Sequence, residues 1–381
     1  MKIIHRVPIA FILLLMSIAS VLAQQVDVKL HTEWTIGDRE DAEEEYLFSE
    51  PEHISTDSKL NVYVADRNSS RIRVFDKSGK FIKSIGNRGQ GPGEFQEITC
   101  MVVDKDDNLV VVDRRNHRFT RFGFLGKDFD TYPFLKNAHF NPMFIVPVSN
   151  GYLISFARPV DDNKLEGVPG NKLLHIFSPD FSSIIKSFCP IEDILDTKVD
   201  FLRHLARTRS IRIASSNDKI IIIPNFYEGQ ILGYNLQRNE WRPAHFPDRT
   251  FASKAWKIIQ MKDYPKADYP HPFLLLSSYN SQFLVSVYRF SLGAAILKNG
   301  DIIHFYYNRT GPDYARVELD VFNAGGKLIG SGIVKSFKKI YDKEGFLRIE
   351  LLARDRDDNL YIKDSREFPV IHKMRLSYKI K

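Results

Sequence analysis

Short hydrophobic runs separated by small polar turns recur along this chain. Residues 48–80, FSEPEHISTDSKLNVYVADRNSSRIRVFDKSGK, align without a gap to residues 95–127, FQEITCMVVDKDDNLVVVDRRNHRFTRFGFLGK, and eleven positions are identical. Average composition would give about two identities over that length. The second stretch therefore repeats the first, and a period of about 47 residues is typical of solenoids, propellers or arrays.

Each repeat predicts four short antiparallel strands. In the first copy they occupy residues 54–57, 61–66, 71–76 and 80–86, and polar turns join them. The runs are rich in β-branched and aromatic residues and alternate with polar ones, and no helical period interrupts them. Four strands joined by tight turns are the content of one β-propeller blade.

A polar turn ahead of the second strand marks each blade, and six such turns occur. They lie at Asn61, Asn108, Asn150–Gly151, Asn217–Asp218, Asn299–Gly300 and Asp358–Asn359. The last blade lacks an outer strand, and residues 28–37 (VKLHTEWTIG) resemble the outer strand of the first repeat. We therefore predict an all-β, six-bladed propeller of four-stranded blades whose N-terminal strand completes the last blade, because closure removes exposed sheet edges.

The loop GNRGQGPGEF (86–95), together with the units NVYVADRNSSRIRVFD and VVVDKDDNLVVVD, resembles the NHL-type and related six-bladed propellers of exported bacterial proteins. The close resemblance covers residues 48–127, and weaker echoes continue to residue 378. It implies the fold and says little about function, because such propellers include binding scaffolds, sensor domains and a few lyases and lactonases.

The first 23 residues have the form of a secretory signal peptide. Lys2 and Arg6 precede the apolar stretch IAFILLLMSIASVLA, and small residues stand before Gln24. The apolar run is shorter than the roughly 20 residues of a membrane span, and a retained anchor helix is the alternative. We expect an exported, periplasmic or extracellular monomer in which residues 24–381 form a single propeller domain without a membrane span.

Charge and cysteine content narrow the functional classes. The formal net charge of +7 includes no dense basic run, so nucleic-acid binding is not predicted. Cys100 and Cys189 stand beside or within apolar strand patterns, where a buried thiol is commoner than a disulfide, although export would permit a pair. The cysteine and histidine spacings of structural metal sites are absent.

Three insertions interrupt the regular spacing, at residues 160–171, 190–210 and 251–282. The second has apolar residues at helical spacing, and the third is predicted to begin as a helix and to continue as a loop rich in Pro and Tyr. All three join strands at one face of the propeller, which we call the inserted face. We expect them to form a rim or partial lid there, because function is often placed on loops of a rigid scaffold.

Arginines are predicted to ring the inserted face. Five of six blades have an arginine at or just after the end of the second strand, and blade four has an aromatic residue. The candidate ligand-binding residues are Arg67, Arg114, Arg115, Arg158, Tyr227, Arg309 and Arg366. Guanidinium groups bind carboxylate, sulfate or phosphate through paired hydrogen bonds. The alternative is structural: nearby aspartates such as Asp66 and Asp113 would pair with these arginines and connect blades.

The sequence lacks the HExxH, GxSxG and Walker signatures of common enzymes. The leading hypothesis is an exported, non-enzymatic scaffold with no cofactor, which binds a small molecule, glycan or protein partner at the inserted face. An acidic glycan or a carboxylate-bearing ligand would suit the arginines. One alternative is a propeller-type lyase or hydrolase with an axial site built either on histidines and carboxylates or on a divalent metal, and another is a purely structural interaction module.

Overall fold

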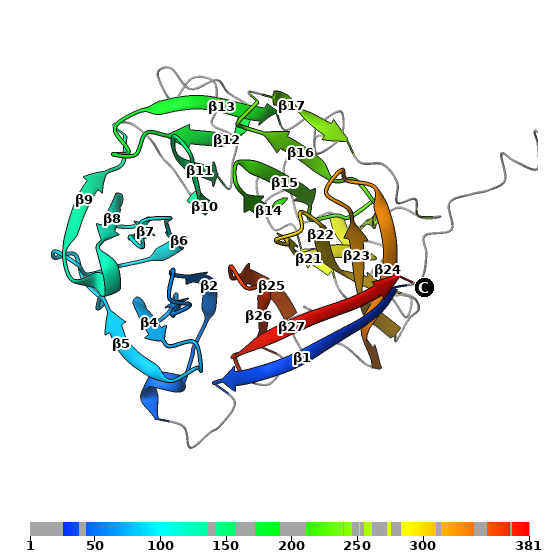
Figure 1. Cartoon of the computed structure of the whole chain (residues 1–381), viewed down its shortest axis with the longest axis horizontal. Helices are drawn as coiled ribbons and strands as arrows, with labels where there is room; N and C mark the ends of the chain where they lie inside the picture. Colours follow the sequence, from blue (N-terminus) through cyan, green and yellow to red (C-terminus); the bar gives the residue numbers. More distant parts are fainter. Residues whose placement is uncertain are drawn as a thin grey trace, which may run out of the picture.

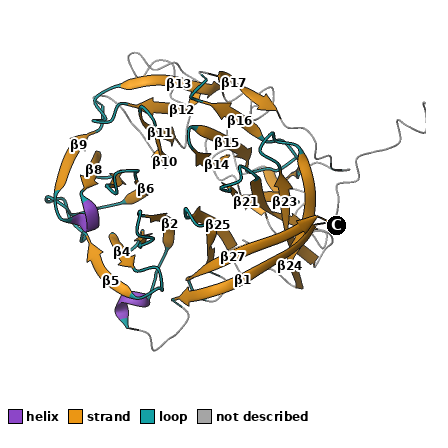
Figure 2. Ribbon diagram, in the orientation of Figure 1, coloured by secondary structure: helices purple, strands orange, loops and turns teal. Residues whose placement is uncertain are grey.

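The protein is described by a computed structural model in which six antiparallel sheets surround a central axis (Figure 1). It describes residues 26–37, 43–135, 142–156, 172–190, 211–238, 240–245, 251, 255–260, 273–275, 283–309, 314–338, 349–365 and 368–380. These residues are almost entirely strands and turns, with short 3₁₀ turns at Glu44–Tyr46 (η1) and Phe124–Gly126 (η2) (Figure 2). None of their helices is long and apolar enough to cross a membrane.

The first three blades follow one another along the chain, and each has its first strand nearest the axis. Blade one comprises β2 (Pro51–Thr56), β3 (Val62–Asp66), β4 (Arg71–Phe75) and β5 (Phe81–Ile85). Blade two comprises β6 (Ile98–Val103), β7 (Leu109–Asp113), β8 (Arg118–Phe122) and β9 (Phe129–Pro133). Blade three comprises β10 (Pro142–Val148), β11 (Gly151–Phe156), β12 (Lys172–Phe177) and β13 (Ile184–Pro190).

The remaining blades complete the ring, and the last one joins the two ends of the described chain. Blade four comprises β14 (Ile211–Ser216), β15 (Lys219–Pro224), β16 (Leu232–Asn235) and β17 (Glu240–His245). Blade five comprises β21 (Arg289–Ile296), β22 (Ile302–Arg309), β23 (Tyr314–Phe322) and β24 (Leu328–Lys338). Blade six comprises β25 (Ile349–Arg354), β26 (Asn359–Asp364), β27 (Val370–Ile380) and β1 (Val26–Ile36).

The predicted closure is confirmed. Strand β1 pairs antiparallel with β27 along its whole length, from Val26 opposite Ile380 to Ile36 opposite Ile371. The N-terminal strand is therefore the outer strand of blade six, and the ring has no open seam.

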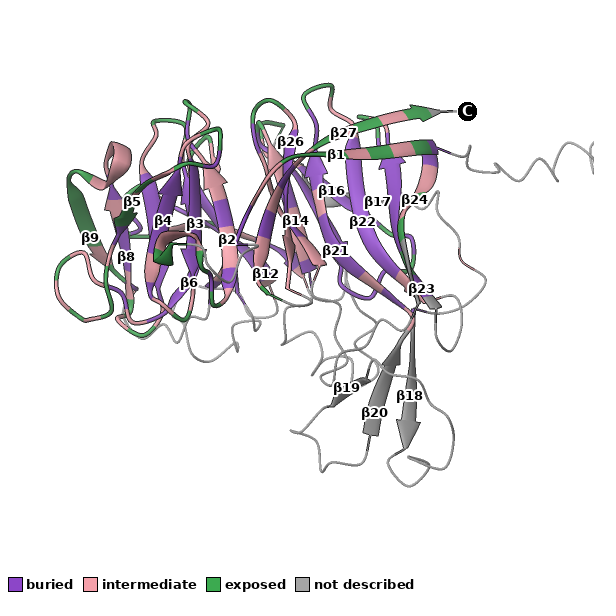
Figure 3. Ribbon diagram, turned by 90° about the horizontal axis from the view of Figure 1, so that it is seen from below, coloured by how far each residue is buried: buried purple, intermediate pink, exposed green. Residues whose placement is uncertain are grey.

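Apolar side chains pack between neighbouring blades, which explains the continuous hydrophobic runs of the second strands. Val111 packs into the interface between blades one and two, whereas Val110 and Val112 pack between blades two and three. Both faces of each sheet are buried, so successive residues alternate between two cores rather than between core and solvent. Figure 3 shows this burial concentrated in the inner strands, while β9 is exposed.

The insertion predicted to begin as a helix at residue 251 is instead built from strands where it is described. Strands β18 (Trp256–Gln260), β19 (Phe273–Leu275) and β20 (Phe283–Val287) form a three-stranded antiparallel sheet in the order β18-β20-β19. A short apolar run such as WKIIQ fits either period, and pairing with β20 decides it. The signal-peptide-like residues and the insertions at 160–171 and 190–210 lie outside the described residues, apart from Pro190.

The turns between first and second strands lie on the face opposite the insertions, which we call the turn face. There Asp107 of blade two accepts hydrogen bonds from the backbone N–H of Ser58 at 2.7 Å and from its hydroxyl at 2.5 Å. Asp218 accepts the N–H of Ser149 at 2.8 Å in the same way, linking blade three to blade four. These aspartates connect consecutive blades independently of the apolar cores.

Candidate functional site

The innermost strands of all six blades enclose a cavity of about 170 Å³ on the propeller axis. Each innermost strand starts at the inserted face and runs to the turn face. The residues that line the cavity are Glu52–Ser55, Cys100–Val102, Met143–Val146, Arg212–Ile213, Gly293–Ala294 and Glu350–Leu352. The second residue of three of these strands is charged, namely Glu52, Arg212 and Glu350. Because these positions follow the start of each strand, their charges lie near the inserted face.

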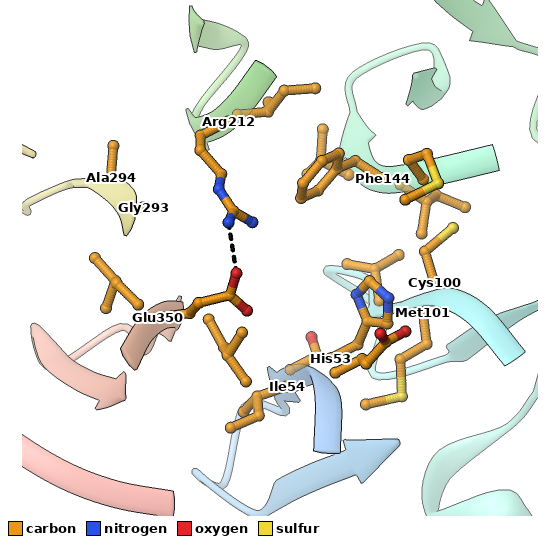
Figure 4. Close-up of a pocket in the computed structure, with 18 residues that line it drawn as sticks. His53, Ile54, Cys100, Met101, Phe144, Arg212, Gly293, Ala294 and Glu350 are labelled. Atoms are coloured by element: carbon orange, nitrogen blue, oxygen red, sulfur yellow. Dashed lines mark hydrogen bonds and ion pairs between the residues drawn. The ribbon is translucent and has the colours of Figure 1, made fainter. Parts of the chain in front are cut away.

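An ion pair crosses the cavity between blades that are not neighbours. Nη2 of Arg212 in blade four donates to Oε1 of Glu350 in blade six at 2.6 Å (Figure 4). Blade five lies between them but contributes only Gly293 and Ala294 to the cavity wall. The long side chains of Arg212 and Glu350 therefore meet across the part of the wall that blade five supplies.

Glu350 is held by a second cation from its own blade. Lys363 stands directly opposite it on the adjacent strand, and Lys363 Nζ lies 3.2 Å from Glu350 Oε2. Burial alone would raise the pKa of the Glu350 carboxyl, but the charges of Arg212 and Lys363 outweigh it and lower that pKa to about 2. The carboxyl is therefore ionised at neutral pH, and two cations surround one anion.

The wall contributed by blades two and three is mostly apolar. Phe144 projects beside the Arg212 guanidinium, and Met101 and Cys100 lie farther across the cavity (Figure 4). Met143 and Ile145 line the same side. The Arg212–Glu350 pair thus lies on one side of the cavity, and the mostly apolar wall on the other has the polar ring of His53 beside Met101 (Figure 4), the mixture common in sites for small organic ligands.

Three of the predicted arginines gather on one carboxylate at the inserted face. Arg114 donates to Glu97 from both Nε, at 3.0 Å, and Nη2, and Arg115 Nε donates to it at 3.2 Å. Arg67 reaches the same glutamate from the preceding blade at 3.3 Å and also pairs with Glu52, which lines the cavity. Burial opposes ionisation, but Arg114 and Arg67 lower the pKa of Glu97. Arg115 keeps 68% of its side chain exposed.

The aspartates that were considered as partners of these arginines instead accept hydrogen bonds from backbone N–H groups of their own blades. Asp66 accepts the backbone N–H groups of Ser49 and Glu50, and Asp113 accepts those of Gln96 and Glu97. Each aspartate thereby fixes the segment that leads into the innermost strand of its own blade. The arginines find their acceptor in Glu97, which the repeat pairs with Glu50, and this identity was the sequence signal for the glutamate.

The other predicted site residues are placed differently. Tyr227 is completely buried, and its hydroxyl donates to Asp320 of blade five at 2.8 Å. Its ring therefore packs between blades four and five instead of facing the mouth. Arg309 lies at the end of β22 with its guanidinium 5.7 Å from the ring centre of Tyr288. Arg158 and Arg366 lie outside the described residues.

Histidines do not assemble a recognisable catalytic set in the described part of the chain. His304 Nε2 lies 2.9 Å from the Ser291 hydroxyl, but both residues are completely buried. His117 packs edge-on against Phe134. No group of three or more His, Cys, Asp or Glu side chains among the described residues is placed to hold a metal ion. Cys100 and Cys189 are buried free thiols, and burial raises the pKa of Cys100.

The cavity residues were missed at the sequence level, although a weak signal existed. Innermost strands are otherwise rich in apolar residues, so a charge at their second position is unusual. Arg212 and Glu350 share that position in different blades, and a comparison of the six innermost strands would have singled them out. Their pairing, across 138 residues of chain, could not be read from spacing.

Residues 41–245 match the family described as 6-bladed beta-propeller (DUF5128), and the chain belongs to this family. Among solved structures, a DUF4221 family member from Bacteroides vulgatus is 10% identical with a TM-score of 0.54, over 93% of this chain and 99% of that one. A protein from Bacteroides fragilis, predicted to be exported, is 13% identical with a TM-score of 0.52, over 92% and 95%. At these identities the likeness concerns the fold alone. No curated protein sequence matches the chain.

Proposed function

We propose that this protein is an exported, non-enzymatic ligand-binding propeller, and that a small organic anion enters its central channel from the inserted face. One observation carries the proposal: strands from all six blades enclose a cavity into which the Arg212 guanidinium projects. A concave site with an apolar wall and a few convergent polar groups is the usual form of a small-molecule site. Export is supported by the signal-peptide pattern of residues 1–23.

The charge balance of the cavity favours an anion over a cation. Arg212 and Lys363 carry two positive charges against the single negative charge of Glu350. Glu52 is already paired with Arg67, so it adds no free negative charge. A carboxylate that binds beside Arg212 would bring the cluster to neutrality, whereas a cation would leave it with two uncompensated charges.

The arginines at the inserted face have a secondary role in this proposal. Arg67, Arg114 and Arg115 are largely compensated by Glu50, Glu52 and Glu97. Exposed Arg115 would act mainly on the approach of an acidic ligand, and this effect weakens with salt because the Debye length is about 8 Å at physiological ionic strength.

Calorimetric titration of the purified chain with hexanoate, benzoate and glucuronate tests the proposal. At least one acid is expected to saturate the wild type below about 1 mM, and Arg212→Gln should weaken it at least tenfold, because a hydrogen bond to a charged group contributes about 1.5–3 kcal/mol. Arg375→Gln is the matched control, since Arg375 pairs with Glu33 on the outer strands, away from the cavity. Equal affinities of Arg212→Gln and the wild type would contradict the proposal.

A further inference from the structure

We infer that the channel binds apolar monocarboxylic acids, with an aryl or alkyl body, in preference to acidic sugars and to dicarboxylates. This inference rests on the proposed function, because it names the ligand class that the same cavity recognises. Three independent features carry it: an unpaired donor on Arg212, the charge count around Glu350, and the position of the apolar wall.

The hydrogen-bond donors of Arg212 specify the acidic group that the ligand carries. Arg212 gives one N–H of Nη2 to Glu350, and within the described part of the chain this is the only hydrogen bond of its guanidinium, whose Nη1 is not among the buried donors. A desolvated donor without an acceptor is unfavourable, and carboxylate and phosphate oxygens are the acceptors that a guanidinium binds most strongly. A ligand carboxylate that enters the cavity can therefore accept from Nη1 without breaking the bond to Glu350.

The charge count limits the ligand to one carboxylate. The cluster of Arg212, Lys363 and Glu350 has one surplus positive charge, which a monoanion cancels. Among the described lining residues Arg212 is the only Lys or Arg, and His53 is the only other side chain that can carry a positive charge, so a second carboxylate meets no second permanent cation there. With one carboxylate bound, the cluster of Arg212, Lys363 and Glu350 is neutral, so a second carboxylate would lose its hydration in the cavity without gaining an opposite charge.

The apolar wall specifies the rest of the ligand. Phe144, Met143 and Met101 offer no hydrogen-bond partners to sugar hydroxyls, and His53 and Glu52 beside them can serve only some of the several hydroxyls of an acidic sugar, so the others would be buried without a partner at a cost in free energy. A phenyl or alkyl group placed against the same side chains gains from burial. The volume of about 170 Å³ lies below the roughly 300–1,000 Å³ of pockets for drug-sized molecules, so the body of the acid is small.

The test compares 3-phenylpropionate with three probes that each lack one feature: its uncharged amide, the polar acid glucuronate, and the diacid phenylsuccinate. We expect the wild-type chain to bind 3-phenylpropionate at least tenfold more tightly than any of the three. Glu350→Gln should strengthen the binding of 3-phenylpropionate about five- to tenfold, because the substitution removes the carboxylate that competes for Arg212. Phe144→Ala should weaken the binding of 3-phenylpropionate at least fivefold and change the binding of glucuronate less than twofold. Phe144→Leu is the conservative control.

The outcomes separate this inference from the proposed function. Glucuronate or phenylsuccinate binding as tightly as 3-phenylpropionate, with Arg212 still required, overturns the inference and leaves the proposed function standing. Binding that ignores Arg212, or no binding of any acid at 10 mM, overturns both. The comparison of the four probes uses the wild-type chain and needs no variant. If Arg212→Gln does not fold, Arg212→Lys replaces it as the test of the guanidinium, because lysine keeps the positive charge.

Discussion

Arg212 of blade four donates a 2.6 Å hydrogen bond to Glu350 of blade six, although blade five stands between their strands. At this level blade five lies close against blade six. A Cβ added at Gly293 would lie 2.5 Å from the carbonyl oxygen of Leu351, so blades five and six approach too closely for a larger residue. The same ion pair therefore lines the candidate site and ties non-adjacent blades together across the channel.

Glu350 should make the protein sensitive to strong acid. The pKa of its carboxyl falls from an ordinary 4.5 to about 2 on folding. The stabilisation is therefore complete above about pH 4.5 and is lost as the pH falls towards 2, by on the order of 3 kcal/mol in the free energy of unfolding. Urea unfolding of the wild type and Glu350→Gln should show a gap that shrinks from about pH 5 to pH 3. A gap independent of pH would contradict the ion pair.

Two buried histidines should lower the stability of the folded protein at a less acidic pH than Glu350 does. Burial lowers the pKa of His175 to about 4, and burial together with the charge of Arg212 lowers that of His304 to about 3. Below about pH 6.5 the unfolded chain takes up protons that the folded protein refuses, so each histidine should cost about 1.4 kcal/mol of stability at pH 5.5. The melting temperature of the double variant His175→Asn, His304→Gln should therefore fall less between pH 7.5 and 5.5. If the melting temperatures of the wild type and the double variant fell equally between pH 7.5 and 5.5, the acid sensitivity would come from other groups.

The carboxylate of Asp107 should stabilise the junction between blades one and two. Asp107 has a positive φ of 61°, so Asp107→Gly removes the carboxylate without straining the backbone. We expect the free energy of unfolding to fall by about 1–2 kcal/mol, because the Ser58 N–H and hydroxyl lose their acceptor. Asp106→Gly on the same turn is the control, since Asp106 pairs through its side chain with the adjacent Lys105. Equal losses in the two variants would show that the inter-blade bonds contribute nothing measurable.

Blade one lacks such an aspartate, which suggests a stabilising substitution. Leu60 occupies the position of Asp107 in the repeat and has the same left-handed backbone, with φ 65°. Asp tolerates this conformation better than Leu, and at this position it faces the equivalent turn of blade six. Leu60→Asp is expected to raise the free energy of unfolding by about 1 kcal/mol in chemical denaturation. Leu60→Asn separates relief of the backbone from the new carboxylate, and a Leu60→Asp protein less stable than Leu60→Asn would refute the added connection.

The sequence by itself determined the blade, the number of blades and their closure. Most of these features are local: a repeat aligned over 33 residues, six polar turns and an unmatched strand at each end carry them, and within blades one to five each strand pairs with its neighbour in the chain. The closing pair of β1 and β27 was also readable, because an incomplete blade at one end of the chain and a surplus strand at the other have only each other as partners.

Only the tertiary structure decided which charges meet. Arginines of two blades bind Glu97, and Arg212 of blade four binds Glu350 of blade six, because the ring brings together side chains that are far apart in sequence. The strands of the insertion after residue 251 were likewise settled by pairing, since a five-residue apolar run fits both periods. Periodicity specifies which face of a strand is buried, whereas an ion pair depends on side-chain reach across a channel whose width is set by all six blades.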